Sequence, residues 1–132
     1  MEKIGVFLVD SQEIFRQGMH IALSQQEDIK VLGEADYSED TLSVIEAFSP
    51  DIVLLDINLP SMGGLQLAHR IGQRLPGISV IALSAYEDDN CLFQAIKAGA
   101  AAYLAKDISP DELANTIRRV FKGEYPINES LL

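Results

Sequence analysis

The sequence predicts one α/β domain in which helices cover both faces of a doubly wound parallel sheet. Short apolar runs alternate along the chain with segments whose apolar residues recur at helical spacing. The runs are continuously apolar, which is typical of strands that are covered on both faces. The chain of 132 residues has the length of one ordinary domain. Together these features indicate five βα units joined by right-handed crossovers.

Five short apolar runs, partly β-branched, are the candidate strands. Turn-forming residues break the chain before the third run, at Ser49-Pro50-Asp51, and before the fourth, at Pro76-Gly77. The predicted strands are residues 4–9, 29–34, 52–56, 78–84 and 102–105.

Four other segments carry apolar residues on one helical face. The last is the best delimited, because Ser109 can cap its N-terminus, Pro110 suits the first helical position and Glu112 completes a capping box. Gly123 is a typical stop signal. The four faces are Phe15-Met19-Ala22-Leu23, Leu67-Ile71-Leu75, Leu92-Ala95-Ile96 and Leu113-Ile117-Val120-Phe121.

Composition argues against several classes of function. A net charge of −10 disfavours nucleic acid as a partner of this segment, because binding phosphates requires clustered Lys and Arg. No apolar run approaches the roughly 20 residues that span a bilayer, so we expect no membrane contact, and the N-terminus does not resemble a signal peptide. The single cysteine, Cys91, allows no intramolecular disulfide and suits a reducing cytoplasm. We expect it to be a small core residue.

Polar side chains stand at the carboxyl ends of the predicted strands. Asp10 follows the first strand and Asp56 ends the third. Ser84 ends the fourth strand and Lys106 follows the fifth. In an open parallel sheet, ligands bind outside these ends, near the point where the strand order reverses. We therefore expect the two carboxylates, the hydroxyl and the ammonium to converge.

Taken singly, most of these residues have an ordinary interpretation, such as a turn residue for Asp10 or a solvated surface lysine for Lys106. Asp56 is harder to explain, because it follows four apolar residues and burying it unpaired would be costly. Together they suit phosphoryl transfer onto a carboxylate, with Asp56 as the nucleophile. Lys106 and Ser84 would contact phosphate oxygens, and a cation such as Mg²⁺ would offset the charge.

The ordered set of motifs resembles the receiver domains of two-component response regulators over about residues 4–123. The motifs are FLVD, VLLDINLP with Met62 and Gly64 after it, IALSA, and AGAAAYLAKD. The resemblance implies a flavodoxin-like (βα)5 fold with the strand order 2-1-3-4-5. It implies no enzyme activity beyond assistance in the domain's own phosphorylation and dephosphorylation.

The resemblance also implies a role for each residue at the carboxyl edge. Asp56 is the expected phosphoacceptor, and Lys106 is the lysine that pairs with the phosphoryl group. Asp10, Asp56 and the backbone carbonyl of Asn58 are the expected ligands of Mg²⁺.

Two further residues are the expected parts of a switch. Phosphorylation would draw the Ser84 hydroxyl toward a phosphate oxygen, and Tyr103 would then turn inward. This movement would change the surface formed by the fourth helix, the fifth strand and the fifth helix.

Finer features resemble the NarL/FixJ subfamily, whose receivers precede a LuxR-type helix-turn-helix domain. These are EIFRQGM after the first strand, KDISPDEL at the start of the last helix and RRVFKGEYPINESLL at the end. We expect residues 1–123 to form the receiver and residues 124–132 to begin a linker to a DNA-binding domain that this chain lacks. The expected partners are a sensor histidine kinase, that DNA-binding domain and a second copy in a homodimer. The expected function is a phosphorylation switch for a transcription regulator.

The acidic pocket departs from the pattern of the family. Receivers usually have two adjacent acids after the first strand, whereas this chain has Asp10-Ser11. Ser11 can offer only a neutral oxygen, and Glu13 is better explained as a first-turn helix acid. One charge pair at about 4 Å contributes roughly 4 kcal/mol at an effective dielectric of about 20, before desolvation is subtracted. We therefore expect weaker Mg²⁺ binding and slower phosphorylation than a pocket with two adjacent acids would give.

Three other functions compete with this one. A haloacid-dehalogenase-type phosphatase would need a second Asp where Asn58 stands, and a nucleotide-binding sheet would need a Gly-rich turn after the first strand. Both are disfavoured. A receiver fold that acts only as a phosphorylation-independent interaction or dimerisation module stays open, because Ser11 replaces an acid.

Overall fold

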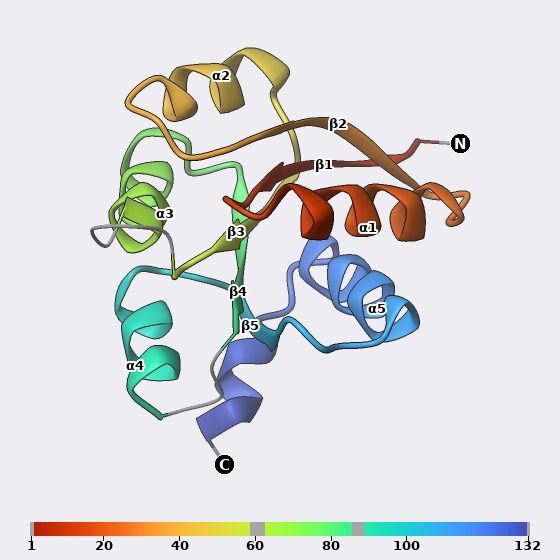
Figure 1. The fold of residues 1–132 in the computed structure, drawn as a ribbon. Coiled ribbons are helices and arrows are strands. Elements are labelled where there is room, and N and C mark those ends of the chain that lie inside the picture. The colour runs from red at the N-terminus through yellow and green to blue at the C-terminus, as the bar shows by residue number, and fades with distance from the viewer. Residues whose placement is uncertain (1, 59–62, 86–88, 132) are drawn as a thin grey trace.

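A five-stranded parallel sheet with the order β2-β1-β3-β4-β5 forms the centre of the molecule (Figure 1). The sequence pattern predicted the parallel sheet, and the family resemblance implied this strand order. The computed structural model describes residues 2–58, 63–85 and 89–131. Two predicted strand boundaries shift by one residue, since the second strand runs on to Ala35 and the fourth begins at Ser79. The strands are β1 (Ile4–Val9), β2 (Ile29–Ala35), β3 (Ile52–Asp56), β4 (Ser79–Ser84) and β5 (Ala102–Ala105).

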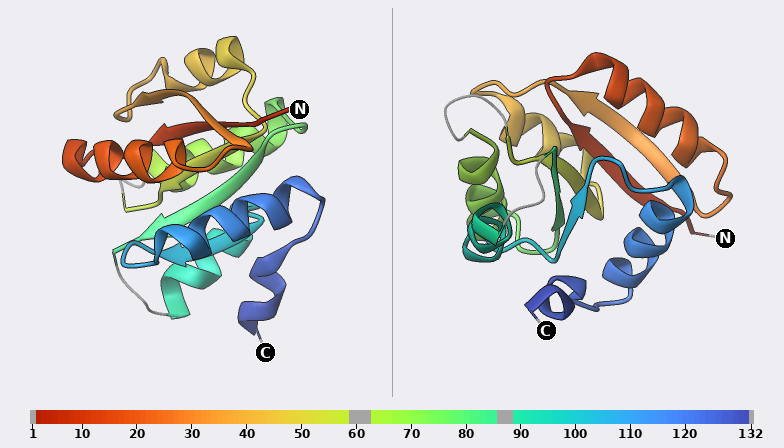
Figure 2. Two further views of the ribbon diagram at one scale, coloured as in Figure 1. Left: turned by 90° about the vertical axis from the view of Figure 1, so that its right-hand side faces the viewer. Right: turned by 60° about the horizontal axis from the view of Figure 1, so that its bottom comes forward.

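Helices cover both faces of this sheet. Figure 2 shows α1 and α5 together on one face, while α2, α3 and α4 lie on the other. The chain ends in a short 3-10 helix, η2. The helices are α1 (Glu13–Ser24), α2 (Thr41–Phe48), α3 (Gly63–Arg74), α4 (Asp89–Lys97), α5 (Pro110–Phe121) and η2 (Pro126–Leu131).

The two faces of the sheet build two apolar cores. Successive side chains along a strand point to opposite faces, so Val6 and Leu8 pack with α1 and α5, whereas Phe7 and Val9 pack with α2, α3 and α4. All residues of β1 and β3 are buried, in agreement with their continuously apolar sequences. Burying one such side chain stabilises the fold by about 1.5–3 kcal/mol. The sheet is therefore a rigid base for the groups at its edge.

The strand register brings the predicted site residues together. Val9 pairs with Leu55 across β1 and β3, so the residues that follow them, Asp10 and Asp56, are neighbours. Asp56 pairs with Leu83 on β4. The chain reverses its strand order between β1 and β3, which is where open sheets of this kind bind ligands.

The predicted boundaries of the last helix are confirmed. The Ser109 hydroxyl accepts a hydrogen bond from the Glu112 amide at 3.2 Å, and Pro110 is the first helical residue. Gly123 has a φ of 95°, a left-handed conformation that favours glycine after a helix.

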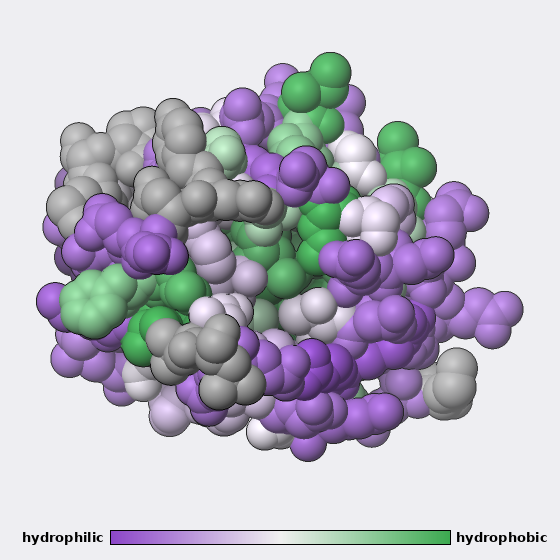
Figure 3. Space-filling view, turned by 90° about the horizontal axis from the view of Figure 1, so that it is seen from below, coloured by the Kyte–Doolittle hydropathy of each residue, from purple (hydrophilic) through white to green (hydrophobic). Residues whose placement is uncertain are grey.

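The C-terminal segment packs against the edge strand β5. The Ile127 amide donates to the Ala101 carbonyl at 2.9 Å, and the Ile127 side chain is 3% exposed within the core on the α2, α3 and α4 side. Figure 3 views the molecule from below Figure 1, where η2 lies, and shows hydrophobic side chains near the centre of this face with hydrophilic ones around them. Across the described residues, every helix is too short or too polar to cross a membrane.

Candidate functional site

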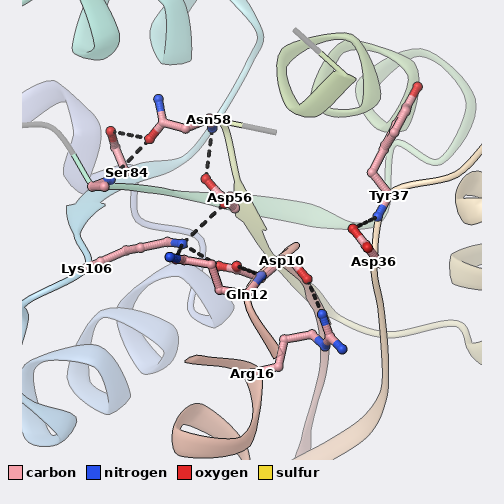
Figure 4. Close-up of polar contacts among 10 residues, drawn as sticks. Asp10, Gln12, Arg16, Asp36, Tyr37, Asp56, Asn58, Ser84 and Lys106 are labelled. Atoms are coloured by element: carbon pink, nitrogen blue, oxygen red, sulfur yellow. Dashed lines mark hydrogen bonds and ion pairs between the residues drawn. The ribbon is translucent and has the colours of Figure 1, made fainter. Parts of the chain in front are cut away.

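Two carboxylates and one ammonium meet at the carboxyl edge of the sheet (Figure 4). Lys106 Nζ lies 2.8 Å from Asp10 Oδ2 and 3.2 Å from Asp56 Oδ2. The side chains of Asp10 and Asp56 are 0% and 5% exposed, and that of Lys106 is 11% exposed. The predicted convergence is therefore present for the two carboxylates and the ammonium. Buried charges require this pairing, because an unpaired carboxylate in the interior would be costly.

Tight turns after β1 and β3 orient the two carboxylates in the same way. Asp10 Oδ1 accepts a hydrogen bond from the backbone amide of Gln12, and Asp56 Oδ1 accepts one from that of Asn58, both at 2.8 Å. Aspartate favours this arrangement because its short side chain reaches the amide two residues on. In α1, Arg16 Nη1 donates to the Asp10 carbonyl at 2.5 Å. One oxygen of each carboxylate is thus fixed, and the other faces Lys106.

The Asp10 carboxylate has an oxygen that lacks a hydrogen bond. Asp10 Oδ2 is fully buried, and it has no hydrogen-bond partner among the described residues. Its contact with Lys106 Nζ at 2.8 Å is an ion contact without hydrogen-bond geometry. A buried oxygen of this kind is available to a cation.

Asp56 is held in an environment that disfavours its charged form. Burial raises the pKa of the Asp56 carboxyl above its ordinary value, and the neighbouring charge of Asp10 raises it further. The hydrogen bond from the Asn58 amide and the charge of Lys106 oppose this shift but do not cancel it. The charged form of Asp56 is therefore stabilised mainly by the Asn58 amide and the Lys106 ammonium.

A second polar cluster lies beside Asp56 and is built on Asn58. The Ser84 hydroxyl donates to Asn58 Oδ1 at 2.8 Å, and the Ala85 amide donates to the same oxygen at 3.1 Å. Ser84 is fully buried. The resemblance implied a role only for the backbone carbonyl of Asn58, whereas the structure shows that its side chain connects the ends of β3 and β4.

The other predicted residues are dispersed around the site. Tyr103 is a half-buried residue of β5 on the face that packs with α4. Ser11 and Glu13 are exposed, and Glu13 Oε1 lies 3.4 Å from Gln17 Nε2, so that it faces its own helix and not the pocket. Cys91 is only half-buried, against the same core as Tyr103. Met62 lies outside the described residues.

Two contacts of Lys106 were not predicted from the sequence. Lys106 Nζ donates to Gln12 Oε1 at 2.5 Å and lies 4.6 Å from the centre of the Phe15 ring. Both residues line an open depression of about 560 Å³ at the mouth of the site, together with Ala85, Ala105, Lys106 and Asp107. In the sequence, only the position of Gln12, two residues after Asp10, indicated that its side chain could reach Lys106.

Comparisons with known proteins agree with this geometry. A family model described as "Response regulator receiver domain" matches residues 6–118. The chain is 36% identical over 127 residues to the uncharacterized transcriptional regulatory protein YhcZ of Bacillus subtilis. The matched region covers 96% of this chain and 59% of that protein. It is also 33% identical to the response regulator GacA of Pseudomonas aeruginosa, over 97% of this chain and 60% of that protein. The chain thus spans little more than half the length of these relatives.

Solved structures give the same result. The receiver domain of the response regulator NarL from Mycobacterium tuberculosis superposes with a TM-score of 0.87 at 34% identity, over 94% of this chain and all of that one. A LuxR-family two-component response regulator from Aurantimonas superposes with a TM-score of 0.87 at 25% identity, over 94% of this chain and 89% of that one. The sheet order, the paired carboxylates with their lysine and the family match lead to one conclusion: this chain belongs to the response regulator receiver domain family.

Proposed function

We propose that the domain accepts a phosphoryl group on Asp56 from a sensor histidine kinase and thereby controls a transcription regulator. One observation carries the proposal: the carboxylate of Asp56 lies in a buried acidic pocket with its Oδ2 against the Lys106 ammonium. A structural aspartate gains nothing from a second buried carboxylate beside it, whereas an acceptor of a phosphoryl group requires compensating charge nearby.

The transfer requires little of the protein beyond position and charge. An oxygen of Asp56 would form a bond to phosphorus as the bond between phosphorus and the kinase's imidazole nitrogen breaks, and the departing imidazole would take up a proton. Lys106 Nζ is 3.2 Å from Asp56 Oδ2, within reach of an oxygen on a phosphoryl group bound there. The domain would assist its own phosphorylation and dephosphorylation without acting on another substrate.

Receiver domains generally bind Mg²⁺ for phosphorylation. The residues present fit such an ion, because Asp10 Oδ2 is a buried oxygen without a hydrogen bond and Mg²⁺ prefers oxygen ligands. Asp10, Asp56 and the backbone carbonyl of Asn58 would hold it, and the bound ion would offset the charge of the phosphoryl oxygens.

The switch would begin at the hydroxyl of Ser84. That hydroxyl donates to Asn58 Oδ1, so contact with a phosphoryl group on Asp56 would exchange one acceptor for another. Tyr103, half-buried on β5, would respond by turning inward. We propose that the altered surface of α4, β5 and α5 controls homodimerisation or the release of a helix-turn-helix domain.

The relatives support this output. The chain matches proteins named as transcriptional regulators over little more than half their length, which is consistent with a receiver of residues 1–123 followed by a linker from residue 124 and a separate DNA-binding domain. We propose that the phosphorylation takes place in the cytoplasm, where a kinase that uses ATP would act.

The test is incubation of the domain with a small acyl phosphate and Mg²⁺, followed by measurement of the intact mass. We expect a gain of one phosphate that is absent in Asp56→Asn and retained in Asp40→Asn, which changes an exposed carboxylate outside the site. A domain that gains no phosphate at saturating Mg²⁺ would instead act as the phosphorylation-independent interaction module.

A further inference from the structure

Gln12 stands at the mouth of the site and contacts the lysine at its centre. Its Oε1 accepts a hydrogen bond from Lys106 Nζ at 2.5 Å, shorter than the 3.2 Å bond from the same nitrogen to Asp56 Oδ2. Figure 4 shows the Gln12 side chain lying along the side of the pocket toward the end of the Lys106 side chain. Gln12 is exposed, whereas the lysine side chain is nearly buried, so the glutamine lies between the ammonium and the solvent.

The contacts of Lys106 leave its ammonium little freedom. An ammonium has three N–H donors, and this one donates hydrogen bonds to Gln12 Oε1 and Asp56 Oδ2. Asp10 Oδ2 lies 2.8 Å from the same nitrogen as an ion contact. The Phe15 ring covers a further side, with its centre 4.6 Å from Nζ. Only the glutamine oxygen is neutral and outside the acidic pair.

The main chain of Gln12 is itself fixed to the site. Its backbone amide donates to Asp10 Oδ1 at 2.8 Å, so one residue holds a carboxylate with its backbone and the ammonium with its side chain. Gln12 is also the N-cap residue of α1, yet its side chain makes no capping hydrogen bond. Glutamine is not among the residues preferred for that position. Helix capping therefore does not account for this side chain.

We propose that Gln12 is a positioning residue for phosphoryl transfer, which holds the Lys106 ammonium where it meets a phosphoryl oxygen on Asp56. This role depends on the function proposed above. When the phosphoryl group forms its ester with Asp56, the lysine must leave that carboxylate oxygen for an oxygen on phosphorus. Among the described residues, the bond to Gln12 is the one hydrogen bond of the ammonium that does not involve a carboxylate, so it can persist through the exchange and limit how far Nζ moves.

The experiment compares three single variants by their rate of phosphorylation with an acyl phosphate at fixed Mg²⁺. Gln12→Met keeps the length of the side chain and removes the acceptor, and we expect a roughly fivefold lower rate. Gln12→Glu keeps an acceptor oxygen and should stay within about threefold of the unsubstituted domain. Gln17→Met is the matched control, because Gln17 is an exposed residue of α1 whose side chain faces Glu13 and not the pocket.

A double-mutant cycle separates positioning from a purely structural effect. In a Lys106→Met background, Gln12→Met should lower the rate no further, because the group that it positions is gone. A second readout does not depend on phosphorylation: in urea unfolding, Gln12→Met and Lys106→Met should be coupled by roughly threefold or more in the unfolding equilibrium constant. If the effects of the two substitutions on unfolding were simply additive, the contact between Gln12 and Lys106 would be wrong.

The outcomes distinguish this inference from the proposed function. Failure of the unsubstituted domain to take up phosphate on Asp56 would overturn the proposed function, and the role of Gln12 with it. Normal phosphorylation of the unsubstituted domain and an equal rate for Gln12→Met would overturn only the role of Gln12. An equal loss of rate with and without Lys106 would show that the glutamine acts elsewhere.

Discussion

Gly64, at the start of α3, lies against the backbone that carries Asp56. A Cβ atom at Gly64 would be 2.4 Å from the Asp56 carbonyl oxygen and 2.8 Å from the Ile57 Cα. Real Cβ atoms essentially never approach other atoms this closely, and a backbone oxygen cannot rotate away as a side chain can. The glycine therefore allows α3 to pack directly on the end of β3.

We predict that Gly64→Ala displaces Asp56 and destabilises the domain. The free energy of unfolding should fall by about 1–3 kcal/mol, as in other overpacked cores, and phosphorylation should slow by on the order of tenfold or more, since the acceptor is misplaced. Urea unfolding and the mass assay measure the two effects.

Gly72→Ala is the control within the same helix. A Cβ at Gly72 would meet nothing within 4 Å, and alanine favours the helix over glycine by about 1 kcal/mol. This variant should be more stable than the unsubstituted domain. If both alanine variants behaved alike, the close approach of α3 to β3 would be wrong.

Asp56→Asn should be more stable to unfolding at neutral pH than the unsubstituted domain. Burial, with a further contribution from the charge of Asp10, raises the pKa of Asp56, so the folded state bears this charge at a cost that the unfolded state does not have. Replacing a buried charged group by a neutral one of the same shape should raise the free energy of unfolding by about 1 kcal/mol.

The same shift predicts a dependence on pH. Because the folded pKa of Asp56 lies above its unfolded value, the folded state binds the proton first as the pH falls. The free energy that the folded state loses by keeping Asp56 charged is therefore largest above the folded pKa. This loss decreases as the pH falls through the folded pKa, and it disappears below the unfolded pKa. The difference in unfolding free energy between Asp56→Asn and the unsubstituted domain should shrink in that window. If this difference in unfolding free energy stayed constant from neutral to acid pH, the raised pKa of Asp56 would be wrong.

The sequence predicted the sheet because its signals are local. Apart from Gly5, β1 is apolar at every position, and β3 is apolar up to its final residue, Asp56. Both strands are buried on both faces. The start of α5 was equally readable, because Ser109, Pro110 and Glu112 act within one turn. The second helix has no clear apolar face in the sequence, because α2 has eight residues and buries only Thr41 and Ile45. It was predicted only from the alternation of strands and helices.

Side-chain contacts across the site were less predictable. Asp10 and Asp56 were found because strand ends in a parallel sheet share one edge. The bonds of Gln12 to Lys106 and of Asn58 to Ser84 join residues 94 and 26 positions apart, and they depend on rotamers that no local pattern specifies. Arg118 is similar: its bidentate pairing with Asp28 ties α5 to the start of β2, and the hydrogen bond from Arg118 lowers the pKa of Asp28.

Ile127 should anchor the C-terminal segment to the receiver. Its side chain is 3% exposed and its amide pairs with the Ala101 carbonyl, so Ile127→Ala should lower the free energy of unfolding by about 2–4 kcal/mol. Tyr125→Ala, two residues earlier and 59% exposed, should change it by less than about 0.5 kcal/mol. Equal stabilities in urea unfolding would assign the segment to a linker that does not contribute to the core.

Ser11→Asp should strengthen Mg²⁺ binding by about tenfold. The variant places a second carboxylate next to Asp10, whose Oδ2 already lacks a hydrogen bond, and even part of one charge pair's interaction corresponds to an order of magnitude in affinity. Isothermal titration with Mg²⁺ measures this directly, without phosphorylation. Ser11→Asn is the matched control, because it has the same size without the charge, and it should bind Mg²⁺ as the unsubstituted domain does. If the Asp and Asn variants bound Mg²⁺ equally, position 11 would lie outside the metal pocket, and slow phosphorylation would need a different cause.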